Sequence, residues 1–188
     1  RVYLDPPEEL RRGWKITRDC AKRGYAPEQV LAELARREPD SAAFIRPQRR
    51  SADIVVRFQP PGDEVDSAHL SMLMVLRPTI CHQDLVEVAE EALAAGCQSI
   101  GLKLGRDEGM PVDLLTVAAD ISPEETSRVE SLLWKRMDFD HHLERDDIGL
   151  FVEGNRGRHS DPLAIAQLFI AYHLLNEAAG GGEGRSRR

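Results

Sequence analysis

The first sixty residues alternate short apolar runs with longer amphipathic stretches. An apolar run at 2–4 predicts the end of a strand, followed by a helix with Asp5 as its N-cap and Gly24 as its C-terminal stop. A second helix is expected over 28–37, where apolar residues recur at helical spacing, and the β-branched run at 54–58 predicts a strand. The order strand, helix, helix, strand is typical of an α/β protein.

The rest of the chain continues this alternation. Strands are predicted at 69–77, 99–104 and 112–118, and helices at 83–95, 122–136 and from Ser160 onward. The helix at 122 opens with a capping-box pattern, Ser122 with Glu125. The glycine-bounded segment 105–109 predicts the turn of a hairpin, and 180–188 predicts a flexible basic tail. The mix of strands and helices is therefore typical of an α/β or α+β protein with a mixed sheet, and α/β is the expected fold class.

Composition excludes several classes of protein. The chain has 188 residues, 41% of them apolar, which is enough to bury a core. No uncharged apolar stretch approaches the roughly 20 residues of a membrane-spanning helix, so no membrane partner is expected. Cysteines stand only at 20, 81 and 97, which excludes a disulfide framework and a cysteine-rich zinc site. This cysteine usage favours a reducing, cytoplasmic location.

Charge is distributed unevenly. The net charge is −7, yet residues 1–50 hold twelve Lys and Arg against eight Asp and Glu. An acidic protein with one basic segment does not resemble a general nucleic-acid binder, which spreads positive charge over a whole face. The pattern favours a local anion site in the N-terminal quarter, or else a helix face that meets solvent.

The helix that follows the first strand carries two parallel stripes. One face, at spacings of 4, 3 and 4, is expected to pack and consists of Leu10, Trp14, Thr17 and Ala21. A row of cations follows one residue along, and this cation row consists of Arg11, Lys15, Arg18 and Lys22. Neighbouring like charges repel by a few tenths of a kcal/mol per pair. The row therefore faces water or a polyanion, and phosphate is the expected polyanion.

The same helix carries a family resemblance. The segment 15–24 (KITRDCAKRG) resembles the lid helix of phosphoribulokinases, and 43–56 (AFIRPQRRSADIVV) resembles the segment after that lid. The match is close over about the first 58 residues and weaker beyond. It implies a P-loop kinase fold in which 1–60 form the lid and the last part of the kinase core, and 61–179 form a C-terminal α/β extension.

The resemblance also implies an activity. Phosphoribulokinases use ATP, with Mg²⁺, to convert ribulose 5-phosphate into ribulose 1,5-bisphosphate for carbon fixation in the Calvin cycle. By resemblance Lys15 would bind the sugar phosphate and Arg18 would stabilise charge on the transferring phosphoryl group. Asp19 would orient Arg18, and Arg23 would bind on the nucleotide or effector side of the cleft. These residue types suit phosphoryl transfer, because positioned cations supply most of its rate.

The sequence departs from the family in its nucleotide-binding and catalytic motifs. The 188 residues contain no G-x-x-x-x-G-K-[ST] loop for the phosphates of ATP, and no residue fits the magnesium-binding carboxylate or the general base by motif. The chain is therefore expected to be a C-terminal part of a kinase that does not turn over alone. Whether it forms a homo-oligomer stays open.

Two alternatives to a phosphoribulokinase are kept. A uridine kinase-type nucleoside kinase shares the lid pattern Arg18-Asp19 and Arg23-Gly24, but such chains resemble this one only to about Pro60. The second alternative is a non-catalytic interaction module that kept the lid as a docking face.

Two further clusters are expected to be polar loops and not sites. One is a possible metal cluster without ligand spacing, formed by Asp138, Asp140, His141, His142, Asp146 and Asp147. The other is 154–159, whose cations precede the last helix and could hold an anion there.

Overall fold

A mixed five-stranded sheet with helices around it forms the body of the protein. The computed structural model describes residues 1–62, 68–79, 83–137 and 147–183. The strands of the sheet are β1 (Val2–Leu4), β2 (Ile54–Gln59), β3 (Ser71–Leu76), β4 (Ile100–Asp107) and β5 (Met110–Val117). Their order is β1-β2-β3-β5-β4, with β1 parallel to β2 and the other pairs antiparallel. The predicted α/β class and mixed sheet are confirmed.

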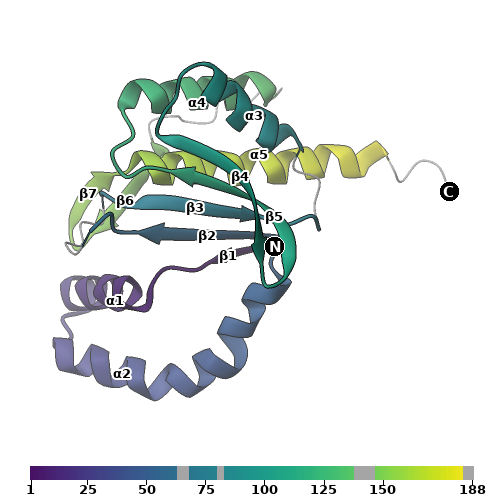
Figure 1. The fold of residues 1–188 in the computed structure, drawn as a ribbon. Helices are drawn as coiled ribbons and strands as arrows, with labels where there is room; N and C mark the ends of the chain where they lie inside the picture. The colour runs from purple at the N-terminus through teal and green to yellow at the C-terminus, as the bar shows by residue number, and fades with distance from the viewer. Residues whose placement is uncertain (63–67, 80–82, 138–146, 184–188) are drawn as a thin grey trace.

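The helices divide into two groups (Figure 1). Those that pack against the sheet are α3 (Gln83–Ala94), α4 (Pro123–Arg136) and α5 (Asp161–Glu183). Beyond the β1 edge lie α1 (Glu8–Arg23) and α2 (Pro27–Asp40). Helix α2 continues through a π-helical turn, η1 (Ser41–Ile45), and then through a 3-10 turn, η2 (Arg46–Ser51). The chain between β1 and β2 is called the helical excursion below, residues 5–53.

The main core lies between the sheet and the helices α3, α4 and α5. Strand β2 turns Ile54, Val56 and Phe58 to this side, as the alternation of side chains along a strand requires. Helices α3, α4 and α5 cover them with Val88, Leu133, Phe169 and other side chains at most a few per cent exposed. A smaller cluster on the opposite face contains Val55, Val75 and Val112.

Two sequence predictions about the N-terminal half are corrected, and a third is confirmed. Asp5 is not an N-cap: α1 begins at Glu8 with no side chain capping it, and Asp5 is bound by Arg49 and Arg57. The second helix does not end before Pro39, because the chain stays helical through η1 and η2. Gly24 does end α1, with φ of 68°, and its amide donates to carbonyls of the last turn.

The other corrections concern turns and the predicted C-terminal tail. The predicted hairpin after 99 exists, but β4 and β5 pair as far as Asp107 and Met110, so the turn is only Glu108 and Gly109. Both have positive φ, 49° and 84°, as tight hairpin turns with the sheet's twist require. Residues 154–159 are not a loop but belong to a second hairpin, described below. Helix α5 continues through Glu183, into the predicted tail.

The start of α4 gives a first prediction. The Ser122 hydroxyl accepts from the Glu125 amide at 3.2 Å, confirming this N-cap, and the Glu125 carboxylate accepts from the amides of Gln98 and Ser99 and from the Ser99 hydroxyl. The Ser99 hydroxyl is the main cause of a lowered pKa for Glu125, against the opposing effect of burial. Glu125→Gln should therefore lower the unfolding free energy at pH 7 by about 1–2 kcal/mol.

The pH dependence of this effect has a fixed sign. A carboxylate whose pKa is lowered by folding stabilises the protein above its unfolded pKa, about 4.3, and the stabilisation disappears as pH falls through the folded pKa. Urea denaturation should therefore show the gap between Glu125→Gln and the parent at pH 7, and its decrease as the pH is lowered below about 4.3 and through the folded pKa. Glu124→Gln, on the exposed neighbour, is the control and should show no such gap.

Candidate anion-binding site

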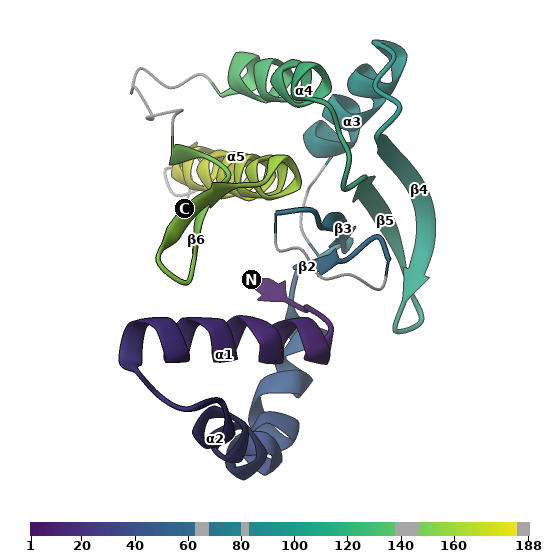
Figure 2. The ribbon, with the colours of Figure 1, turned by 90° about the vertical axis from the view of Figure 1, so that its left-hand side faces the viewer.

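A cavity of 510 Å³ lies between α1 and a small hairpin, β6 (Leu150–Glu153) with β7 (Arg156–His159). Figure 2 shows α1 and this hairpin facing one another, with the start of α5 beside the hairpin. Apolar side chains at the carboxyl ends of β1 and β2, Leu4 and Phe58, line it together with Leu70. The carboxyl ends of parallel strands are where α/β proteins commonly bind ligands.

The predicted cation row lines this cavity. Its four members, Arg11, Lys15, Arg18 and Lys22, all contribute to the wall formed by α1. Arg11 is paired with Glu8 at 2.8 Å. Within the described part of the chain, no ion pair joins Lys15 or Lys22 to a carboxylate. The row therefore faces a concave surface, and two of its charges are available to an anion.

The face of α1 beside the cation row is less buried than the sequence pattern predicts. Leu10 is buried in the main core and Trp14 packs partly against it, but Thr17 and Ala21 are exposed. Trp14 and Thr17 also line the cavity. Thr17 therefore meets the cavity and Ala21 is exposed outside its lining, where the sequence pattern predicts a packed surface.

Arg18 and Asp19 are in direct contact. The Arg18 Nε donates to Asp19 Oδ1 at 2.9 Å, and Arg23 Nη1 lies 3.6 Å from the same oxygen. The hydrogen bond from Arg18 is the main cause of a lowered pKa for Asp19, which is only 3% exposed. This carboxylate is ionised at neutral pH and holds the Arg18 guanidinium by one edge.

The four residues predicted by resemblance therefore lie in two places. Lys15 and Arg18 line the cavity. Asp19 and Arg23 do not: they form the ion-paired group that holds Arg18 from behind. Asp19 therefore contacts Arg18 directly, whereas Arg23 contacts Asp19 and does not line the cavity.

The opposite wall was not predicted. It includes Phe151, Val152 and Glu153 of β6, and Gly154, whose φ of 62° starts the hairpin turn. Arg158 donates to Glu153 at 2.6 Å, so this cation of the predicted 154–159 loop is committed to a carboxylate. The signal that could have revealed the hairpin is the apolar run Leu150–Val152 before Gly-Asn. Two strands of four residues give only a weak periodic pattern.

The described residues fit no metal ion. Among them, no group of three or more His, Cys, Asp or Glu side chains is close enough to hold one. Of the acidic cluster proposed from the sequence, 138–146 lie outside the described residues.

The described helices include none that is both long and apolar enough to cross a membrane.

The fold and the site together define a class: an α/β protein whose helical excursion presents a row of cations to a cavity at the strand ends. The family comparison is consistent with this. Residues 1–63 are similar to the phosphoribulokinase / uridine kinase family.

Three individual relatives are named phosphoribulokinases, one member of that family. A phosphoribulokinase from Synechocystis is 48% identical over 59 residues, which are 31% of this chain and 18% of that protein. Chloroplastic phosphoribulokinases from Triticum aestivum and Arabidopsis thaliana are 44% and 31% identical over 106 residues, which are 55% of this chain. These matches span 26% and 27% of the two plant proteins. The chain thus spans about a quarter or less of the length of these relatives.

Proposed function

We propose that this chain provides the lid and C-terminal region of a phosphoribulokinase, an enzyme that phosphorylates ribulose 5-phosphate with ATP to give ribulose 1,5-bisphosphate. One observation carries the proposal. Lys15 and Arg18 lie in the segment that matches the family, and both line a cavity large enough for a sugar phosphate.

The proposed roles come from the family resemblance, and the contacts of Lys15 and Arg18 support them. Lys15, without a carboxylate partner among the described residues, would bind the phosphate of the sugar as a point charge. Arg18, gripped through Nε by Asp19, would turn its remaining N–H groups to the equatorial oxygens of the transferring phosphoryl group. Arg23 would support Asp19 and act on the nucleotide or effector side of the cleft. An excursion that moves over the bound substrates would also exclude water.

ATP is the phosphoryl donor that a kinase family implies. The 188 residues contain no phosphate-binding loop, and the described residues include no magnesium-binding cluster. We therefore assign neither the ATP phosphates nor Mg²⁺ to this chain, and expect no ADP formation from ATP and ribulose 5-phosphate by it alone. A cytoplasmic location is proposed on the cysteine content, in which Cys20 and Cys97 are free thiols.

The two alternatives are weaker on specific grounds. The family matched by residues 1–63 includes uridine kinases, but the plant relatives that align over 106 residues are phosphoribulokinases. An interaction module would not need Lys15 and Arg18 to line a cavity. Binding measurements with the sugar phosphate and with uridine separate the three.

A titration of the 188-residue chain tests the proposal. Calorimetry should show binding of ribulose 5-phosphate but not of uridine, and Lys15→Ala should weaken the binding about tenfold, as loss of one charge-assisted contact does. The control is Lys135→Ala, which removes an exposed lysine of α4 outside the cavity. Uridine binding would favour the nucleoside kinase, and equal affinity of Lys15→Ala and the parent would contradict the role of Lys15.

A further inference from the structure

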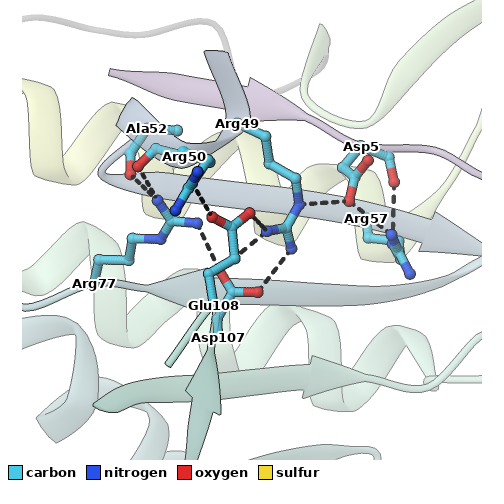
Figure 3. Close-up of polar contacts among 8 residues, drawn as sticks. All are labelled: Asp5, Arg49, Arg50, Ala52, Arg57, Arg77, Asp107 and Glu108. Atoms are coloured by element: carbon cyan, nitrogen blue, oxygen red, sulfur yellow. Dashed lines mark hydrogen bonds and ion pairs between the residues drawn. The ribbon is translucent and has the colours of Figure 1, made fainter. Parts of the chain in front are cut away.

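A network of ion pairs lies where the helical excursion leaves and rejoins the sheet (Figure 3). It joins five parts of the chain: the end of β1, η2, β2, the end of β3 and the β4–β5 turn. Its members, called the neck network below, are Asp5, Arg49, Arg50, Arg57, Arg77, Asp107 and Glu108. None of them lines the anion cavity.

The network first joins the two ends of the helical excursion, and this junction is called the neck. Arg49 of η2 donates through Nε to Asp5 at 3.0 Å, although 44 residues separate them. Arg57 of β2 donates to the same Asp5 carboxylate at 2.7 Å and to the Asp5 carbonyl at 3.2 Å. The departing and returning chains are therefore tied together one residue after Leu4, which lines the cavity.

The network then fastens this neck to the β4–β5 hairpin. Both Nη atoms of Arg49 bind Asp107, at 3.1 and 2.8 Å, and Nη1 also binds Glu108 at 2.9 Å. The fork geometry of a guanidinium fixes direction as well as distance when it binds a carboxylate by two atoms. Arg49 thus has all three of its nitrogens committed, to groups on both sides of the neck.

Arg77 holds the network from inside the protein. Its side chain is fully buried, and it donates to Asp107 at 2.6 Å and to the backbone carbonyls of Arg50 and Ala52 at 2.6 and 3.2 Å. Burial alone would raise the pKa of Asp107, but the hydrogen bonds from Arg49 and Arg77 outweigh it and lower that pKa. Buried ion pairs are costly to desolvate and add little stability, so directional control is their better-supported use here.

Few apolar contacts hold α1 and α2 against the rest of the protein, so their orientation depends on the neck network. Within the described residues, α1 contributes only Leu10 to the main core, with Trp14 partly packed against it. Helix α2 buries Val30 and Leu34, but neither belongs to the two clusters that pack on the sheet. A helix pair held by so few apolar anchors can tilt unless directional contacts prevent it.

We propose that Arg49, held by Asp107, which Arg77 binds in turn, is a positioning residue that sets the orientation of α1 and its cation row over the anion cavity. The ligand that the cavity takes rests on the proposed function, but the orientation of α1 does not. Arg49 acts on the site entirely through the backbone of the excursion.

Two measurements on the 188-residue chain test this role. With Trp134→Phe as background, Trp14 is the only tryptophan, so acrylamide quenching reports how far α1 lifts from the cavity. Arg49→Ala should raise the quenching constant about twofold, as expected when a half-buried segment opens. It should also weaken ribulose 5-phosphate binding about tenfold, because small displacements of oriented groups are costly. Far-ultraviolet circular dichroism should stay that of the parent.

The matched control is Arg136→Ala. Arg136 pairs with Glu91 across α3 and α4 at 2.7 Å, and its side chain is 23% exposed against 22% for Arg49. Its loss should change neither the Trp14 quenching nor the binding. Asp107→Asn keeps the side-chain shape, removes the charge, and should reproduce Arg49→Ala; it decides the matter if Arg49→Ala does not fold.

The outcomes separate this proposal from the proposed function. Trp14 quenching equal to that of the parent in a folded Arg49→Ala or Asp107→Asn chain overturns the positioning role. If the parent binds no ribulose 5-phosphate, the proposed function fails, and the quenching result alone decides the role of Arg49.

Discussion

Gly149→Ala is expected to lower the free energy of unfolding by about 2–5 kcal/mol, from two costs that add. Gly149 has φ of 81°, where an L-residue costs about 1–2 kcal/mol. A Cβ at this position would also stand 2.9 Å from both the Ser160 carbonyl and the Ala164 Cβ, and overpacking of this kind costs about 1–3 kcal/mol. The backbone and a short side chain cannot move aside easily.

The control for this substitution is Gly96→Ala. Gly96 has a similar φ of 86°, but a Cβ there would meet nothing within 4 Å. Urea denaturation should therefore give a cost of about 1–2 kcal/mol for Gly96→Ala, the conformational part alone. Equal costs for the two variants would contradict the close contact between the β6–β7 hairpin and the start of α5. This contact fixes one wall of the anion cavity, since Gly149 directly precedes β6.

The cation row could be predicted from the sequence because it depends on local geometry alone. Residues 11, 15, 18 and 22 share a face in any α-helix, and Gly24 marks the end of this one. The orientation of that face toward a cavity needs the partner wall. The partner, Glu153 with its neighbours in β6, lies more than a hundred residues away in the chain.

The neck network could not be predicted for the same reason. Asp5 before two prolines has the local features of an N-cap, yet its partners Arg49 and Arg57 are 44 and 52 residues away. Arg77 stands at the end of a predicted strand, and nothing in its neighbourhood indicates that it is fully buried. Asp5 forms long-range ion pairs instead of a local helix cap, and a single sequence indicates only the local interaction.

The same contrast explains the error at Pro39. Proline lacks an amide donor and usually ends a helix, so the local signal is strong. In the structure the chain stays helical by changing its hydrogen-bond pattern, first to the π type in η1 and then to the 3-10 type in η2. This longer path delivers Arg49 and Arg50 to the β4–β5 turn. The unusual helix is therefore coupled to the neck network.

Arg18→Ala should reduce turnover about a hundredfold or more, because a cation aimed at the transition state is typically worth about 3 kcal/mol. The measurement needs a phosphate-binding loop, which a chimera supplies. The 59-residue segment that matches the Synechocystis phosphoribulokinase replaces its counterpart in that enzyme, and ribulose 5-phosphate-dependent ADP formation is followed. The chimera with Arg18 intact must first be shown to be active.

Arg12→Ala is the matched control in the same chimera. Arg12 is an exposed cation of α1 that does not line the cavity, so its loss should leave kcat and KM close to those of the parent chimera. Lys15→Ala should instead raise the KM for ribulose 5-phosphate more than it lowers kcat, since a contact to the non-reacting phosphate acts on binding. A turnover of Arg18→Ala within a factor of about three of the parent, far below the loss typical of a transition-state cation, would show that the Arg18–Asp19 pair serves only the structure of the helix.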